Sequence, residues 1–365
     1  MINNITIKNF KSLKKADVNT NSLNLLMGLN GMGKSSFIQV LLLLMQSDKL
    51  AERVIDLNGI LTQIGQGRDA LYQFAEEREI VFELTLDGQP AFSWRFPYQS
   101  DKEKLTAEAG YTKEQMRFFR EQTKRFQYIS AERMGPRDIY EASSTVVADK
   151  KQLGLWGEYS AYYVDVFGLE DIVPETLRKY PAFSDKLIHQ LNAWMQEISP
   201  GVSINTKYVP EANKVILDYQ FDLIARKTNS FRPKNTGFGI SYVLPVVLAL
   251  LTAEKGKIIV IENPESHIHP RGQAELGKLI ALAAQAGAQL FIETHSDHIL
   301  NGIRVAAKEG IIDKSKVNVL YFDKQTTDTE QYSKITQIKV DKNGALSDYP
   351  KDFLDEWSNQ LSKLI

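Results

Sequence analysis

The 365-residue chain contains no cysteine, which excludes disulfides, a thiolate metal site and a cysteine nucleophile. It also lacks an excess of either charge, because 44 Lys and Arg oppose 45 Asp and Glu. A globally basic coat for nucleic acid is therefore excluded, although a local basic patch is not. The longest apolar run, Ile240–Leu251, contains Pro245 and is shorter than the roughly 20 residues that span a bilayer.

No basic stretch followed by an apolar stretch opens the chain, so we expect no signal peptide, no membrane association and a cytoplasmic location. Hydrophobic residues make up 43% of the sequence and charged residues 24%, as in ordinary globular proteins. The length predicts one large domain or two modest ones.

The residue pattern predicts an α/β protein. Alternating apolar residues predict strands early in the chain, and two of them flank Asp87-Gly88, a good hairpin signal. The second half alternates apolar strand-like runs with helix-like ones, which is typical of a sheet covered by helices. The expected strands are 2–7, 23–27, 78–86, 91–96, two within 202–226, 257–261, 289–293, 317–322 and 336–340; the expected helices are 35–46, 100–126, much of 152–199, 240–254, 271–286, 296–308 and 349–364.

The strongest motif is GLNGMGKSS, residues 28–36, which matches G-x-x-x-x-G-K-[ST] between a predicted strand and a predicted helix. Glycines let the backbone wrap a phosphate, and the helix N-terminus favours an anion. Lys34 can reach the β and γ phosphates, and the Ser35 hydroxyl can bind Mg²⁺. The nucleotide contacts expected here are Asn30, Gly31, Gly33, Lys34, Ser35 and Ser36.

An apolar strand followed by an acid forms the second motif, IENPESHIHP, residues 261–270. A P-loop protein places its Mg²⁺-binding acid at such a strand end, which assigns Glu262 to the metal. His267 and His269 lie two residues apart, and Glu265 could join them as a metal ligand. Without a nearby thiolate, we favour a structural or subunit-contact role for the two histidines.

Two further motifs lie near these. ETHSDH, residues 293–298, ends a predicted strand with His295, at the edge of an α/β sheet where ligands bind, and we expect His295 to sense the γ-phosphate. NTGFGIS, residues 235–241, opens the helix before the 257–261 strand and could form an anion site at its N-terminus. The residues expected to contact nucleotide there are Thr236, Gly237, Gly239 and Ser241.

In this order, the four motifs resemble those of ABC-type P-loop ATPases of the RecF, SMC and OLD group. The likeness extends to SAERMGPR, residues 130–137, and DYPKDFLD, residues 348–355, which resemble a subfamily of stand-alone bacterial ATPases with a small C-terminal domain of unknown function. It leaves out about 100–126 and 150–225. Gln63 and Gln66 are weak candidates for the Q-loop of this group.

The resemblance implies an α/β fold of the ABC type with a mixed central sheet, an antiparallel N-terminal β part and a helical insertion. It divides the chain into an N-terminal ATPase lobe with Walker A (1–99), a mostly helical insertion with a β hairpin (100–230), a C-terminal lobe with signature, Walker B and switch histidine (231–314), and a small C-terminal domain (315–365). It also implies ATP and Mg²⁺ as cofactors.

The resemblance further implies a homodimer or a higher even-numbered assembly. ATP on Walker A of one copy would be covered by the 236–241 helix start of another. Members of the group act in DNA repair, chromosome organisation and antiphage defence, often with a nuclease. With about 70 residues after His295, we expect no fused Toprim nuclease and instead a separately encoded effector.

One position departs from the pattern of the group. The residue after the Walker B acid is usually a glutamate that polarises the attacking water, and here it is Asn263. An amide orients water but cannot accept its proton. Glu265 could replace it only if the backbone turns its side chain inward. We therefore expect catalytic roles for Glu262, Asn263, Glu265 and His295, with slow hydrolysis.

The leading interpretation is an ATP-gated dimeric clamp or sensor in antiphage defence or DNA transactions. The alternative is a scaffold that binds ATP and barely hydrolyses it. A kinase or transporter subunit is disfavoured, because neither an acceptor-site base with a lid nor an L-S-G-G-Q motif is found. The basic residues Lys113, Arg117, Arg120 and Lys124 form one helical stripe that could contact nucleic acid, although a solvated surface is favoured.

Overall fold

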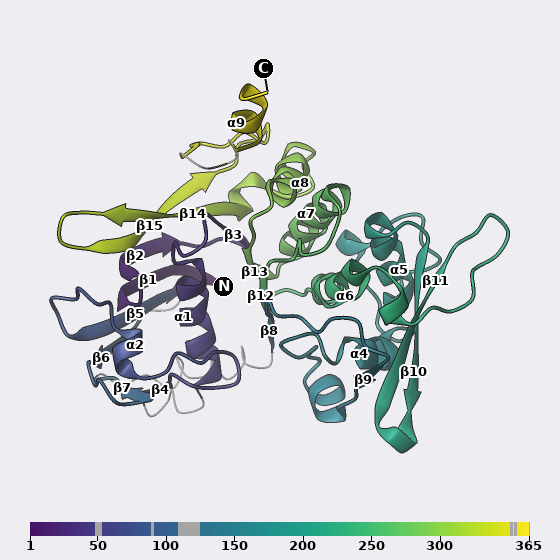
Figure 1. The fold of residues 1–365 in the computed structure, drawn as a ribbon, viewed down its shortest axis with the longest axis horizontal. Coiled ribbons are helices and arrows are strands. Elements are labelled where there is room, and N and C mark those ends of the chain that lie inside the picture. The colour runs from purple at the N-terminus through teal and green to yellow at the C-terminus, as the bar shows by residue number, and fades with distance from the viewer. Residues whose placement is uncertain (48–52, 89–90, 109–124, 351–352, 354–355, 365) are drawn as a thin grey trace. The chain divides into compact units, whose positions relative to one another are not determined.

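The computed structural model describes residues 1–47, 53–88, 91–108, 125–350, 353 and 356–364 (Figure 1). The chain forms two compact units. Unit 1 comprises residues 1–126, 314–341 and 345–365, and unit 2 comprises residues 127–313 and 342–344. Unit 1 thus joins the two ends of the sequence, while unit 2 is built from its middle.

A four-stranded antiparallel sheet, in the order β2-β1-β5-β6, makes up the first part of unit 1. Alternation of buried and half-buried residues along β1 explains its two-faced packing, with Ile5, Ile7 and Phe10 in the core. β5 and β6 form the expected hairpin, and Gly88 at its turn has φ 65°. The strands are β1 (Ile2–Phe10), β2 (Leu13–Asn19), β5 (Glu79–Leu86) and β6 (Phe92–Pro97).

The second part of unit 1 holds a mixed group of strands, β15-β14-β3. β14 (Val317–Thr326) pairs parallel with β3 (Leu23–Met27) and antiparallel with β15 (Gln331–Lys339). An early strand of the sequence and two late ones therefore share a sheet. The helix α1 (Lys34–Gln46) follows β3, and its apolar residues are buried. Smaller elements are β4 (Val54–Asp56), α2 (Gly67–Ala70), β7 (Lys104–Thr106) and α9 (Glu356–Ser362).

Unit 2 contains the strands β8, β12 and β13, of which β12 and β13 pair parallel. Their residues are buried on both faces, because helices follow each strand as in α/β folds. A second sheet in this unit has the antiparallel order β10-β11-β9. The strands are β8 (Phe126–Ile129), β9 (Ile139–Glu141), β10 (Val202–Val209), β11 (Lys214–Phe221), β12 (Ile258–Glu262) and β13 (Gln289–Glu293).

The helices of unit 2 are α4 (Ser160–Phe167), α5 (Leu187–Ile198), α6 (Phe238–Leu251), α7 (Pro270–Gln285) and α8 (Asp297–Lys308). The longest, α7, has 16 residues and begins with a proline, which tolerates the first helical position. Within the described part of the chain, no helix combines the length and apolar character needed to cross a membrane.

The middle of the sequence differs in part from expectation. The helix expected over 100–126 is wrong at its start, because Lys104–Thr106 forms β7, paired antiparallel with β4. Its basic stripe falls on residues 109–124, outside the described residues. Helices also cover only part of 152–199, where Pro174 and Pro181 interrupt helix formation.

Candidate functional site

In unit 1, the loop after β3 is closely supported by late strands of the sequence. Gly28 has φ 133°, and a Cβ there would lie 2.2 Å from the carbonyl oxygen of Phe322. Gly33 has φ 101°, and its Cβ would lie 2.3 Å from Oγ of Ser333 and 2.9 Å from Oγ of Ser12. Only glycine fits both the conformation and the space at these two positions.

Lys34 is the first residue of α1 and lies against this loop. Its Nζ donates hydrogen bonds to the carbonyl oxygens of Gly28 at 2.8 Å and Leu29 at 2.9 Å. Only 3% of the residue is exposed. The ammonium group is thus held at the inner side of the loop by two backbone oxygens rather than directed into solvent.

The loop and helix start fit a phosphate group. Asn30, Gly31 and Ser35 are exposed, and nothing lies within 4 Å of a Cβ placed on Gly31. A 13-residue helix begins here, and its first N–H groups have no partner within the helix. The Ser35 side chain is available to an ion, whereas Ser36 is buried. Exposed backbone and one exposed hydroxyl thus surround this helix N-terminus, which we call the phosphate cradle.

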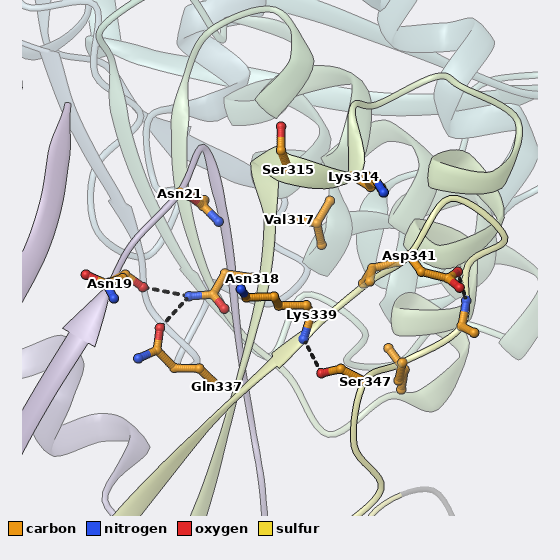
Figure 2. A pocket seen from close by; sticks show the side chains of 13 residues that line it. Asn19, Asn21, Lys314, Ser315, Val317, Asn318, Gln337, Lys339, Asp341 and Ser347 are labelled. Carbon is orange, nitrogen blue, oxygen red and sulfur yellow. Dashed lines mark hydrogen bonds between the residues drawn. The ribbon is translucent and has the colours of Figure 1, made fainter.

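A pocket of about 610 Å³ lies at the other end of the strands (Figure 2). Residues at the start of β14 and in the loop before β3 line it, whereas the Gly28–Gly33 loop follows the end of β3. Asn318 Nδ2 donates to the carbonyl oxygen of Asn19 at 2.7 Å, so part of its polar lining is satisfied internally. Ligands of α/β sheets bind at the carboxyl ends of strands, which separates this pocket from the phosphate cradle.

In unit 2, the predicted acid Glu262 lies beside a second acid at the ends of two adjacent parallel strands. Glu262 ends β12 in register with Glu293, which ends β13. The carboxylate of Glu262 accepts a hydrogen bond from the backbone N–H of Ala131 at 3.2 Å. Burial raises the pKa of Glu262, and this hydrogen bond opposes the shift in part.

Asn263 follows β12 in the left-handed backbone region, with φ 44°. Its N–H donates to the carbonyl oxygen of Glu293 at 2.8 Å. Asparagine tolerates this conformation better than most residues. The side-chain Oδ1 is buried and has no hydrogen-bond partner among the described residues. The residue therefore turns the chain sharply as it leaves β12.

The Glu265 side chain is bound to the end of β13. Its two oxygens accept hydrogen bonds from the Thr294 hydroxyl at 2.7 Å and from the backbone N–H of His295 at 2.8 Å. The Thr294 hydroxyl in turn accepts from the N–H of Ser296 at 3.0 Å. His295 is exposed. Glu265 thus fixes the backbone that carries the predicted switch histidine, a role that its sequence position does not indicate.

Arg133 is a buried residue that the sequence did not single out within the SAERMGPR segment. It is 4% exposed, and its guanidinium donates to the carbonyl oxygens of Glu262 at 2.6 Å and Asn263 at 2.5 Å. It also donates to the carbonyl oxygen of Ser130 at 3.1 Å and lies 5.0 Å from the ring of Tyr242. Burial lowers the pKa of Arg133 to about 10, so the group is charged at neutral pH.

The glycines at the start of α6 differ in their surroundings. Gly237 precedes the helix, is exposed, and has nothing within 4 Å of an added Cβ. A Cβ on Gly239 would lie 2.2 Å from the carbonyl oxygen of His267. The Ser241 hydroxyl is buried against the hydroxyl of Tyr219 at 3.0 Å. Of the residues predicted here, Gly237 is therefore accessible to a ligand or another molecule, whereas Ser241 is buried.

The remaining predicted residues have local contacts. Thr236 donates through Oγ1 to the carbonyl oxygen of Pro233 at 2.9 Å. His269 Nδ1 accepts from the N–H of Arg271 at 3.3 Å, at the start of α7. His267 packs edge-on against Phe238. No group of three or more potential metal ligands among His, Cys, Asp and Glu occurs within the described residues.

Two candidates for the Q-loop lie in unit 1. Gln63 is exposed, and the N–H of Gln66 donates to the carboxylate of Asp69 at 2.8 Å at the start of α2. These contacts assign no nucleotide-binding role to either residue.

Two family models match the sequence. One, described as "AAA domain, putative AbiEii toxin, Type IV TA system", matches residues 23–301. The other, described as a protein of unknown function (DUF3696), matches residues 312–364. The comparison with curated proteins gives no match.

Two solved structures share the fold. An Smc head bound to the C-winged helix domain of ScpA has a TM-score of 0.57 and 12% identity, over 93% of this chain and 98% of that one. An Smc head domain with an extended coiled coil, bound to the C-terminal domain of ScpA from Pyrococcus furiosus, has a TM-score of 0.53 and 11% identity, over 100% of this chain and 99% of that one.

Proposed function

Because the chain belongs to this family of AAA domains and has the fold of the Smc heads, it is an ABC-type P-loop ATPase, and we propose that ATP binding joins two copies of it into a clamp. The observation that carries the proposal is the exposed start of α6, where Gly237 leaves open space in front of a helix N-terminus. A helix N-terminus favours an anion, and we propose that the phosphate bound by a second copy is the anion that it meets.

The phosphate cradle of unit 1 is the proposed site for the β and γ phosphates. Lys34 is already placed against the loop, and the glycines admit the backbone conformation that a phosphate requires. Mg²⁺, when bound, neutralises the charge that develops on the phosphates. In unit 1, Ser35 is the residue that we assign to it, and Ser35→Ala tests that assignment. The role of Glu262 in Mg²⁺ binding is proposed from its motif alone and is tested by Glu262→Gln.

Hydrolysis is proposed to be slow. Asn263 carries no proton acceptor of sufficient basicity, and both carboxylate oxygens of Glu265 already bind the end of β13. The exposed His295 is proposed to sense the γ-phosphate from the segment that Glu265 holds. Slow turnover suits a sensor that dwells in its ATP-bound state better than a motor.

The proposed partners are a protein effector and nucleic acid. The Smc heads of the similar structures are solved with a domain of ScpA, which supports a protein partner for this chain. The family description names a toxin of a type IV TA system, which supports a role in bacterial defence. We propose a separately encoded effector, such as a nuclease, with a contact to nucleic acid as an alternative. The second candidate function is a scaffold that ATP holds together and that barely hydrolyses ATP. The presence of Asn263 in place of a glutamate favours it.

Gly237→Glu tests the clamp. The new carboxylate would enter open space and repel a phosphate, while the P-loop of the same chain is unchanged. We expect near-normal nucleotide affinity by calorimetry and loss of ATP-dependent association by light scattering with non-hydrolysable ATP. Gly237→Ala, without charge, is the matched control and should associate like the wild type. Association of Gly237→Glu equal to that of Gly237→Ala would overturn the clamp.

Gly239 is less suitable for this test, although it lies in the same motif. Any side chain there meets the backbone oxygen of His267 at 2.2 Å, so a substitution distorts the start of α6 directly. Loss of association in a Gly239 variant would therefore not separate charge repulsion from local misfolding.

A further inference from the structure

The segment 130–137, which we call the coupling segment, contacts two functional parts of unit 2 at once. Through Arg133 it holds the backbone at the end of β12. Two N–H groups of one guanidinium donate to the successive carbonyl oxygens of Glu262 and Asn263. Because the guanidinium is planar and rigid, this pair of bonds fixes the orientation of both peptide groups.

The same segment contacts the first turn of α6. A Cβ on Gly135 would lie 2.8 Å from the ring of Phe238, so the backbone at Gly135 packs directly against that side chain. The guanidinium of Arg133 lies over the ring of Tyr242, one turn further along α6. His267 packs against both rings, at 4.8 Å from Phe238 and 4.9 Å from Tyr242.

The guanidinium of Arg133 lies between backbone carbonyl oxygens and this aromatic face. Its carbonyl contacts fix one side of the guanidinium, whereas the Nε atom is buried with no hydrogen-bond partner among the described residues. The ring of Tyr242, 5.0 Å from the guanidinium, is a further contact of the group besides its carbonyl oxygens. Phe238 is 47% exposed at the start of α6, where a second copy is proposed to dock.

We propose that Arg133 is a positioning residue that transmits the state of the α6 N-terminal turn to Glu262 and Asn263, and so couples docking at α6 to ATP hydrolysis. This inference rests on the proposed clamp. Docking that shifts Phe238 and Tyr242 moves the guanidinium, and the guanidinium carries with it the two peptide groups that orient the Glu262 carboxylate and the Asn263 amide.

Substitutions at both ends of the contact test this coupling. Arg133→Met keeps the apolar stem and removes the charge and the hydrogen bonds, and Arg133→Lys keeps one charge without the planar fork. Tyr242→Leu removes the ring, and Tyr242→Phe is its matched control, because it keeps the ring and loses only the hydroxyl. Each variant is measured for nucleotide affinity, ATP-dependent association, thermal unfolding and single-turnover hydrolysis with protein in excess over ATP.

We expect Arg133→Met to hydrolyse ATP at least tenfold more slowly, with nucleotide affinity within twofold of the wild type and association retained. Arg133→Lys and Tyr242→Leu should fall between Arg133→Met and the wild type, and Tyr242→Phe should match the wild type. The double variant Gly237→Glu, Arg133→Met should be no slower than the slower single variant, because both changes interrupt one route.

Unchanged turnover in Arg133→Met overturns the inference. It is also overturned if the rate reductions of the two single variants multiply in the double variant, because that would show independent effects. In a folded Arg133→Met protein, a loss of nucleotide affinity as large as the loss of turnover also overturns it, since that result describes a residue that supports the nucleotide site as a whole. If Arg133→Met fails to fold, equal turnover in Tyr242→Leu and Tyr242→Phe overturns it. Failure of the clamp proposal is a separate result: wild-type protein that binds ATP but does not self-associate in its presence.

Discussion

Glu265 and Thr294 connect the ends of two adjacent parallel strands, with the Thr294 hydroxyl donating to the Glu265 carboxylate at 2.7 Å. This contact sets the position of the next residue, His295, whose N–H binds the other oxygen of the same carboxylate. Glu265 could either hold the backbone at His295 or act as the general base. A carboxylate with both oxygens in hydrogen bonds is a poor general base, so the contact favours the first role.

Replacing Glu265 by Gln tests that separation. An amide offers one acceptor oxygen to two donors, so one hydrogen bond is lost at about 1–3 kcal/mol. We expect lower thermal stability and a reduction of hydrolysis of about tenfold or less. Thr294→Val, which removes the same contact from the other side, is the matched control and should behave alike. Abolished turnover in Glu265→Gln with normal turnover in Thr294→Val would identify Glu265 as the general base.

A carboxylate at position 263 should speed hydrolysis. In Asn263→Glu the new group can accept a proton from water, although the left-handed backbone adds strain of about 1–2 kcal/mol. Asn263→Gln has the same length and the same strain without the carboxylate. We expect single-turnover hydrolysis at least fivefold faster in Asn263→Glu than in Asn263→Gln; equal rates would show that position 263 does not limit the reaction.

Lys34→Ala should abolish tight nucleotide binding. The substitution removes the charge that we assign to the β and γ phosphates and two hydrogen bonds to the loop. A charge-assisted contact of about 2–3 kcal/mol corresponds to roughly 100-fold in affinity. Calorimetry with Mg-ATP measures the loss, with Lys15→Ala, an exposed lysine on β2, as the control. Equal affinity in the two variants would contradict the P-loop assignment.

The pKa shift of Glu262 predicts a pH-dependent cost to stability. Burial raises the pKa of Glu262 above its ordinary value of 4.5 in the folded state. The folded protein therefore holds this proton more tightly than the unfolded chain, and stability decreases as pH rises from that value through the folded-state pKa. Glu262→Gln removes the ionisation, so it should be more stable than wild type at neutral pH and show little difference near pH 4.

Thermal unfolding across pH measures this difference, with the exposed Glu309→Gln as control. A difference of the same size at both pH values would contradict the shift. The same Glu262→Gln protein should lose Mg²⁺-dependent hydrolysis more completely than Asn263→Ala. Gain of stability with loss of activity is the expected signature of a buried functional carboxylate.

The two loop glycines predict different costs for the same substitution. Gly31→Ala adds a methyl group to open space and incurs only the strain of a positive φ, about 1–2 kcal/mol. Gly33→Ala also places Cβ against Ser333 and Ser12, whose hydroxyls are bonded to each other at 2.8 Å. Losing that bond adds about 1 kcal/mol. Gly33→Ala should therefore unfold at a lower temperature than Gly31→Ala; the reverse order would contradict the packing.

Much of the fold was predictable because its signals are local. The run Leu23–Met27 is apolar except for Asn24 and forms β3 with those bounds, and the Asp87-Gly88 turn joins the expected hairpin. Short strands were missed at β4 and β7. Each has three residues and is specified by a partner some 50 positions away, for which periodicity gives no signal.

The candidate site was predictable to the same extent. The glycines, Lys34 and the strand-terminal acids follow from motif and position, because their chemistry requires those residue types. Arg133 did not follow, since its partners are backbone carbonyls that carry no sequence signature. The Glu265–Thr294 contact was also missed, because it depends on the parallel register of β12 and β13.

The parallel pairing of β3 with β14 determines when unit 1 can fold during synthesis. Leu23 lies beside Val317, so β3 lacks this neighbour until roughly 290 further residues have been added, about 15–60 s at ordinary translation rates. The Gly28–Gly33 loop likewise lacks its contacts with Phe322 and Ser333 until those residues have been synthesised. The nascent chain therefore exposes an apolar strand edge for much of its synthesis, and versions ending before residue 312 should aggregate rather than bind ATP.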